Sequence, residues 1–404
     1  MRILIKECKK ILDTRLLLIL CVFTLLFYRM FMQIVSYPSG GQGTNSSYDI
    51  PFAAELVKEL GPSLKMDDFG KLDAKIAELK NEYHTIIASN EILKSAGITT
   101  FDEMKDYHTE VESKDEADIT NKEHIVADEI ERLIFFNKTT SKLTFELQYA
   151  EHINRSRGID YGVPKDQVTS VIKEYYNRGS ALYQKSMNHR ITKDTLSLLP
   201  DGMLFILQSD MKSMAILLLI HFLVLIVPYQ VKERLRKVTP LYAATHTGRK
   251  IYQKQFLASV LSCGVVGILQ LLVYLCVYIG QGLTLFWKCK CWSDSNNCYW
   301  CDNLSFGTYM VIYLFLVLLF SLAGVVIAYL IGRMAVNYIA GIAMSIPIGG
   351  VICIFIMILF GELFSFDENT TMVLWELPCI AVWILFTFLL IMCRLKKDRT
   401  ADVC

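Results

Sequence analysis

Six long apolar runs divide the chain, and a polar segment separates each run from the next. Each run has about the 20 residues that an α-helix needs to cross the hydrocarbon core of a bilayer. Because lipid offers no partner to an unpaired backbone amide, such segments cross the membrane as helices. The pattern therefore predicts six membrane-spanning helices, at 16–35, 214–231, 256–280, 308–331, 335–360 and 372–393.

The segment before the first run has one apolar face. Leu4, Cys8 and Ile11 recur at helical spacing, while Lys6 and Lys9 occupy the other face. This pattern is typical of an amphipathic helix that lies in the headgroup layer before the chain enters the membrane. A basic start followed by an apolar run is also the pattern of a signal peptide. No small-residue cleavage pattern follows the run, so we expect a permanent anchor instead.

The longest polar segment, residues 37–212, separates the first two apolar runs. Its apolar residues recur at helical spacing in 69–96 and 119–153, and a further helix is expected at 165–186. Acidic residues outnumber basic ones in this segment. It holds no histidine, cysteine or carboxylate cluster with the spacing of a metal or catalytic site. We expect a mostly α-helical domain with a long hairpin, which binds, gates or shields rather than catalyses.

The predicted fold class is an all-α polytopic membrane protein. It has six transmembrane helices and a large, mostly helical extracellular domain between the first and the second. The predicted organisation is an amphipathic interfacial helix at 1–15, a first transmembrane helix at 16–35, the extracellular domain at 37–212, a five-helix transmembrane region at 213–393 and a cytoplasmic tail at 394–404.

Basic residues predict the orientation. Lys and Arg are retained on the cytoplasmic side of short membrane loops. They gather at the N-terminus, in the tail, at Arg333 and above all in a basic segment at 232–254, where the only acid is Glu233. Six spans with both termini in the cytoplasm satisfy every loop. The basic residues of this segment are Lys232, Arg234, Arg236, Lys237, Arg249, Lys250 and Lys254.

Composition and motifs exclude several classes of function. The chain is 53% hydrophobic with a net charge of +1, so its overall charge favours neither a nucleic-acid partner nor an acidic substrate. The phosphate-binding motif G-x-x-x-x-G-K-S/T does not occur, nor do the hydrolase, zinc-protease and kinase motifs. We therefore expect no catalytic residue, no bound cofactor and no enzyme activity in this chain.

A cysteine-rich loop at 287–306 is expected outside the cell. Its four thiols follow the spacing C-x-C-x6-C-x2-C. On an oxidising surface they can form two disulfides, and a zinc site with four thiolate ligands is the alternative. We favour disulfides, because the outer surface disfavours free thiolates. The residues are Cys289, Cys291, Cys298 and Cys301.

Small residues recur every four positions in the last spans. Gly324, Ala328 and Gly332 form one such stripe, and Gly341 and Ser345 form another. Stripes of this kind let helices approach closely. They indicate either packing between helices of this chain or an interface that moves or dimerises.

Few polar side chains interrupt the spans, and none suggests a chain of acids for proton coupling. His221 lies nearest the middle of a span, and we expect a neutral histidine that bonds to a helix neighbour. The polar candidates are Arg29, His221, Gln270, Asn337 and Glu376.

The basic segment resembles a known arrangement. Lys232-Glu233-Arg234 closes the second run, and Thr245-His246-Thr247-Gly248-Arg249-Lys250 with Lys254 leads into the third. Together with the basic N-terminus and the large outer segment, this is similar to the permease subunits of ATP-binding-cassette exporters of the type-2 membrane family, particularly those of Gram-positive bacteria. Leu235-Arg236-Lys237 stands where that family usually has a Gly-Thr pair after the glutamate. The resemblance implies an ATPase-coupling segment with Glu233, Arg234, Thr245, Gly248, Arg249, Lys250 and Lys254 at matching positions.

The resemblance also implies partners. ATP and Mg would bind to a separate cytoplasmic ATPase subunit, and a second permease subunit would complete a homodimer or heterodimer in the lipid bilayer of the plasma membrane. Two other interpretations of these residues remain open beside the family resemblance. The basic segment could hold to anionic lipid, or the chain could be a membrane sensor or scaffold whose extracellular helical domain binds a ligand or peptide.

Overall fold

The computed structural model describes residues 2–36, 46–65, 68–114, 119–157, 195–200, 203–236, 251–291, 304–362 and 373–400. The chain divides into two compact units. We call Met1–Ser39 together with Asp201–Cys404 the bundle unit, and Gly40–Pro200 the inserted unit. Each unit is described by itself.

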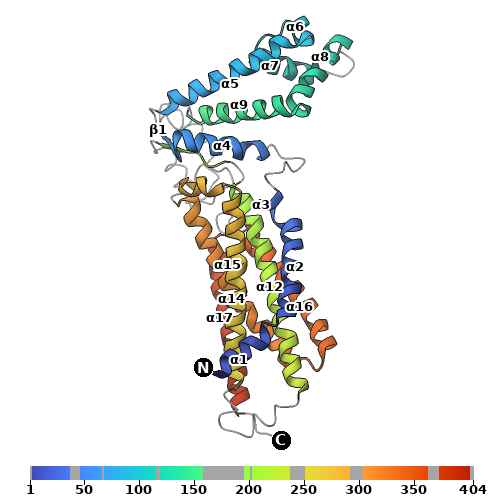
Figure 1. The fold of residues 1–404 in the computed structure, drawn as a ribbon, viewed down its shortest axis with the longest axis vertical. Helices are drawn as coiled ribbons and strands as arrows, with labels where there is room; N and C mark the ends of the chain where they lie inside the picture. Colours follow the sequence, from blue (N-terminus) through green and yellow to red (C-terminus); the bar gives the residue numbers. More distant parts are fainter. Residues whose placement is uncertain are drawn as a thin grey trace. The chain divides into compact units, whose positions relative to one another are not determined.

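The bundle unit contains six helices that are long and apolar enough to cross a membrane, among the residues described. Figure 1 shows them side by side. This confirms an all-helical chain with six candidate membrane-spanning helices. They are α2 (Thr14–Phe31), α12 (Met203–Leu235), α14 (Ile251–Gly280), α15 (Phe306–Met334), α16 (Tyr338–Glu362) and α17 (Val373–Thr400).

Shorter helices accompany these six. Helix α1 (Arg2–Ile11) precedes α2 and packs against α14, and the short α3 (Gln33–Ser36) follows α2. A 3-10 helix, η6 (Leu283–Lys288), leads out of α14. In α1 the predicted apolar face is turned inward at Ile11, which is fully buried, and the Cys8 thiol lies 3.8 Å from the Ala258 carbonyl oxygen of α14.

Two helices have other ends than the predicted spans. Helix α12 begins at Met203, so residues 203–212 are part of this helix, while the bounds of its membrane-spanning part stay a prediction. The first span does not run to residue 35, because Met32 is extended and α3 begins after it. The buried Asp210 of α12 accepts hydrogen bonds from the Gln33 and Ile34 amides at 2.6 and 3.2 Å, which caps α3.

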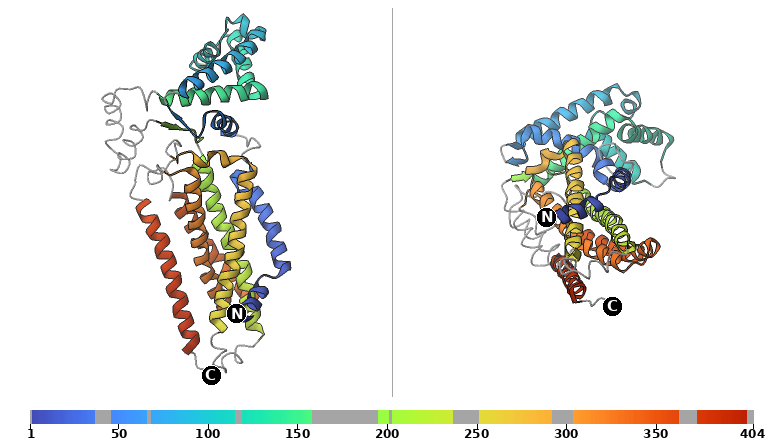
Figure 2. Two further views of the ribbon diagram at one scale, coloured as in Figure 1. Left: turned by 60° about the vertical axis from the view of Figure 1, so that its left-hand side comes forward. Right: turned by 60° about the horizontal axis from the view of Figure 1, so that its bottom comes forward.

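Helix α12 lies in the interior of the bundle. Of its most apolar 18-residue window, 72% is buried, against 22% for α2 and 17% for α17, which lie on the outside (Figure 2). It packs against α15 and α16 as well as α2 and α14. Because α12 contacts most of the other long helices, a movement of α12 would change the packing of most of the bundle.

The small-residue stripes pack against α12. A Cβ atom at Gly332 would lie 2.6 Å from Gln230 Cβ, and one at Gly341 would lie 3.0 Å from Val227 Cγ1. At Gly324 the nearest atom is Leu219 Cδ1, at 3.6 Å. Of the two alternatives from the sequence, packing within the chain therefore accounts for these glycines.

We predict that Gly332→Ala destabilises the bundle relative to Gly350→Ala. Alanine favours a helix by about 1 kcal/mol over glycine at either position, but only at Gly332 does the new methyl group meet the neighbouring helix. Overpacking of this kind costs about 1–3 kcal/mol. Thermal unfolding of the two variants in detergent measures the difference. Equal melting temperatures would show that α12 and α15 do not approach so closely.

The inserted unit is mainly helical over its described residues. Its two short strands pair antiparallel, with Leu64 opposite Leu196, and were not predicted. An extracellular location of this unit stays a prediction. Its elements are α4 (Ser46–Leu60), β1 (Ser63–Lys65), α5 (Phe69–Ser89), α6 (Glu91–Ser95), α7 (Phe101–Glu112), α8 (Asn121–Glu131), the π-helical η3 (Arg132–Phe136), α9 (Lys138–Arg157) and β2 (Thr195–Ser197).

Helices α5 and α9 pack against each other, although α6, α7, α8 and η3 lie between them in the sequence. The buried Tyr83 hydroxyl of α5 lies 3.0 Å from the Thr144 hydroxyl of α9. Asparagines break the two predicted long helices: Asn90 caps α6 through the Ile92 amide, at 3.0 Å, and Asn137 precedes α9. The helix expected at 165–186 lies outside the described residues.

Helix α8 begins with a capping box. The Thr120 side chain accepts from the Glu123 amide, and Glu123 accepts in return from the Thr120 amide at 2.8 Å. Lys114 lies 2.8 Å from the Glu123 carboxylate. The hydrogen bond from Lys114, together with those from Thr120, lowers the pKa of Glu123 to about 2.

This shift predicts the acid sensitivity of α8. Because the pKa of Glu123 is lowered by folding, its stabilisation is complete above the ordinary pKa of 4.5 and is lost as the pH falls toward 2. In the full chain, amide hydrogen exchange should show α8 losing protection between pH 5 and pH 2. Glu123→Gln should lower protection at pH 6 and reduce that pH dependence. Glu129 of α8, whose pKa is lowered by the hydrogen bond from Arg132, contributes to the remainder. Glu82→Gln, at an exposed position of α5, is the control, and an unchanged pH profile in Glu123→Gln would contradict the assignment.

Candidate functional site

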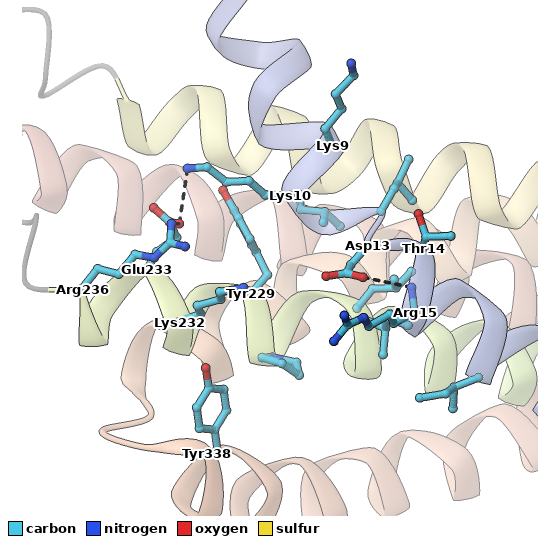
Figure 3. A pocket seen from close by; sticks show the side chains of 16 residues that line it. Lys9, Lys10, Asp13, Thr14, Arg15, Tyr229, Lys232, Glu233, Arg236 and Tyr338 are labelled. Carbon is cyan, nitrogen blue, oxygen red and sulfur yellow. Dashed lines mark hydrogen bonds and ion pairs between the residues drawn. The ribbon is translucent and has the colours of Figure 1, made fainter.

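One end of the bundle unit carries many of the basic residues that flank its long helices. Here α1 runs into α2, α12 and α15 end, and α14 and α16 begin. We call it the basic end, and Figure 3 shows part of it. Of the basic segment 232–254, the structure describes 232–236 and 251–254, and residues 237–250 lie outside the described residues.

Two buried carboxylates meet at the basic end. Glu7 of α1 and Glu233 of α12 are exposed by only 4% and 7%. The Lys10 ammonium lies between them, 2.8 Å from Glu7 Oε1 and 3.3 Å from Glu233 Oε1. Tyr229 donates a hydrogen bond to Glu7 Oε2, and Arg236 donates to Glu233 Oε1 at 3.0 Å. We call these five residues the ion cluster.

The ion cluster balances its charges. A buried charge is costly unless it is paired, and here two acids face two cations. Partial burial by itself would lower the pKa of Lys10, but the hydrogen bonds and charges of Glu7 and Glu233 outweigh burial and raise that pKa. The stabilisation by Lys10 is therefore complete below its ordinary pKa of 10.5 and is lost only in more alkaline solution. Lys10 therefore stays charged at neutral pH and holds α1 to the end of α12.

Arg234 joins the same stretch of α12 to α15. Its Nη1 donates to the carbonyl oxygens of Arg333, Met334 and Ala335 at 3.2, 3.1 and 3.1 Å. The last carbonyl groups of a helix have no partner within the helix, and a cation there also complements the helix dipole. The C-terminal ends of α12 and α15 are therefore joined by one side chain.

The beginning of α14 is fixed to α15 as well. The Arg333 guanidinium lies 4.2 Å from the centre of the Tyr252 ring, a cation–π contact. The Tyr329 hydroxyl donates to the Tyr252 carbonyl oxygen at 3.2 Å. Both ends of the basic segment are thus attached to the bundle, one through α12 and the other through α14.

The predicted coupling residues fall into two groups. Glu233 and Arg234 contact the bundle itself, and Lys254 lies half-buried on α14. Thr245, Gly248, Arg249 and Lys250 lie outside the described residues. Sequence reasoning missed Glu7, Lys10 and Tyr229. Glu7 carried a signal, because it shares the apolar face of α1 with Leu4 and Ile11, where an acid needs a buried partner.

A pocket of about 580 Å³ opens beside the ion cluster. The elbow between α1 and α2 forms one wall, and α12 with Tyr338 of α16 forms the other (Figure 3). Basic side chains dominate the polar part of its lining. The lining residues are Lys9, Lys10, Ile11, Leu12, Asp13, Thr14, Arg15, Leu16, Ile19, Leu225, Pro228, Tyr229, Lys232, Glu233, Arg236 and Tyr338.

A second polar group lies within the bundle and has a structural role. The buried His221 places Nε2 3.1 Å from the Thr24 hydroxyl and Nδ1 2.7 Å from the Leu217 carbonyl oxygen, a helix neighbour as expected. Gln270 donates to the same Thr24 hydroxyl at 2.9 Å. These contacts join α2, α12 and α14. Asp210, which also accepts from the Tyr274 hydroxyl at 3.2 Å, was missed because its segment was not assigned to a span.

The cysteine loop is described only in part. Cys289 and Cys291 are fully buried, and the Phe306 amide donates to the Cys289 carbonyl oxygen at 2.8 Å. Cys298 and Cys301 lie outside the described residues. The choice between disulfides and a zinc site therefore stays a prediction. Within the described ranges, no group of three His, Cys, Asp or Glu residues is placed to hold a metal ion.

Comparisons of the chain with family models, with curated proteins and with solved structures found no match.

We predict that Lys10→Gln destabilises the protein more than Lys6→Gln. Both changes remove one positive charge from α1, but only Lys10 neutralises two buried carboxylates. A buried polar group left without its partner costs about 1–3 kcal/mol, and more when it is charged. The additional substitution Glu7→Gln should recover part of the loss, since it removes one of the uncompensated charges. Thermal unfolding of the single and double variants measures both effects. Equal losses in Lys10→Gln and Lys6→Gln would show that the ion cluster does not form.

Proposed function

We propose that the chain is the membrane-spanning subunit of an ATP-driven ABC transporter, an exporter of the type-2 membrane family. The observation that carries this proposal is the attachment of both ends of the basic segment to the bundle. Glu233 and Arg234 hold one end to α1 and α15, and Tyr252 holds the other to α15. A segment attached at both ends transmits a push from a partner to the helices instead of absorbing it.

The proposed mechanism follows from these attachments. The basic end faces the cytoplasm, as the positive charge of its loops favours. A separate cassette ATPase, which binds the ATP and Mg, contacts residues 237–250, and the positive charges of Arg249 and Lys250 attract its acids. ATP binding shifts α12 through Glu233 and Arg234, and the bundle changes between two packings. Two permease subunits, identical or homologous, enclose the transport path in the plasma membrane.

The inserted unit supports a second candidate function. Ile125, Phe135 and Phe136 are exposed by 57%, 57% and 79% in α8 and η3, two elements that follow one another directly in the sequence. An exposed apolar patch is typical of a binding surface. A membrane sensor or scaffold whose extracellular unit binds a peptide or ligand is therefore the alternative. Retention of an apolar peptide by the full chain, with no ATPase associated, would favour it.

Copurification tests the transporter proposal. The tagged full chain, extracted from the membrane of its own host, should carry an ATPase with the G-x-x-x-x-G-K-S/T motif. Arg249→Glu should reduce the amount of ATPase recovered at least tenfold, which corresponds to about 1.4 kcal/mol of binding free energy. Lys6→Glu, the same charge reversal on α1, is the control and should leave the recovery within twofold. The proposal fails if no such ATPase copurifies, or if the two variants behave alike.

A further inference from the structure

Some of the cations that line the pocket at the basic end form ion pairs with the bundle, and others are exposed. Lys10 and Arg236 are held by Glu233, and the Asp13 carboxylate accepts from the Arg15 amide at 2.9 Å. The side chains of Lys9, Arg15 and Lys232 are exposed. Within the described residues, no ion pair or side-chain hydrogen bond is recorded for these three.

The charge of the lining is strongly unbalanced. Five cations and two acids line the pocket, a surplus of three positive charges. The unused cations come from three elements, namely α1, α2 and α12, and the pocket wall brings them together. Figure 3 shows the elbow of Asp13, Thr14 and Arg15 opposite Lys232. Side chains so arranged suit a ligand with a compact negative charge, such as a phosphate ester.

The other part of the lining is apolar and continues onto the outer surface of the bundle. Leu16 and Ile19 line the pocket, and Ile19 is 60% exposed. Beyond it on α2, Val22 is 51% exposed, and on the neighbouring α16 Ile342 is 60% exposed. In a membrane-spanning helix, such side chains face acyl chains. The basic wall and the apolar surface therefore meet at the level where a helix passes from headgroups to hydrocarbon.

From this arrangement we infer that the pocket binds the headgroup of an anionic phospholipid. The phosphate lies between Arg15 and Lys232, and the acyl chains lie along Leu16 and Ile19. Lys9 points away from these two cations in Figure 3 and adds positive charge at the edge of the pocket. A free phosphate ion offers the same charge but uses none of the apolar wall. The bound lipid stabilises the elbow between α1 and α2 beside the ion cluster. The inference depends on the bundle being in a membrane and not on an ATPase partner.

Lipid titration of the purified, delipidated full chain in detergent tests the inference. The melting temperature is measured with added phosphatidylglycerol, phosphatidylcholine or inorganic phosphate, and native mass spectrometry counts the lipid retained. Phosphatidylglycerol should stabilise the chain at concentrations at least tenfold lower than the other two additions. Equal stabilisation by phosphatidylcholine, or by inorganic phosphate, would overturn the lipid assignment.

Substitutions locate the binding site. Each basic residue near a membrane surface strengthens the binding of anionic lipid about fivefold. Arg15→Gln with Lys232→Gln should therefore weaken phosphatidylglycerol binding at least fivefold. The control is Lys6→Gln with Arg29→Gln, which removes the same charge from α1 and α2 outside the pocket and should change binding less than twofold. Equal losses in the two pairs would show a diffuse attraction and would contradict the pocket. Lys232→Gln alone, at an exposed position, provides the same comparison against Lys6→Gln if the double variant does not fold.

Discussion

The salt bridge from Lys10 to Glu7 and Glu233 is the interaction on which the basic end depends. It joins the first helix of the chain to a helix that lies more than 220 positions later in the sequence. Since both carboxylates are buried, the arrangement is stable only while the ammonium stays between them. The same stretch of α12 holds the end of α15 through Arg234. Two neighbouring residues near the end of α12, Glu233 and Arg234, therefore connect this helix to α1 and α15, directly before the rest of the basic segment.

Much of the fold could be predicted from the sequence, because long apolar runs in a membrane have only one way to satisfy their backbone. Six helices follow from that constraint. Their ends do not, since they depend on contacts distant in sequence. Asp210 of α12 caps α3 through a contact 177 positions away, which a hydropathy pattern cannot predict. Asn90 and Asn137 break helices by capping, a local effect that apolar periodicity does not register.

The candidate site could likewise be predicted only in part from the sequence. The basic segment was evident from charge alone, and Glu233 stood out as its only acid. Glu7, which shares the Lys10 ammonium with Glu233, was indicated only by its place on the apolar face of α1. For Tyr229 there was no indication in the sequence beyond its position near a helix end. Gly332 and Gly341 illustrate how structure decides between alternatives, because the space at each is filled by side chains of α12. Small-residue stripes can serve packing within one chain or contact with a second molecule. In this chain they serve packing between its own helices.

Taken together, the contacts describe a bundle whose central helix is accessible from the basic end. Whether a partner ATPase uses that access depends first on which side of the membrane the basic segment faces. Labelling of Arg249→Cys with a membrane-impermeant thiol reagent measures this most directly, with the parent chain as the background control. The account predicts labelling in inverted membrane vesicles and none in intact cells. Labelling in intact cells would place the segment outside and contradict the account.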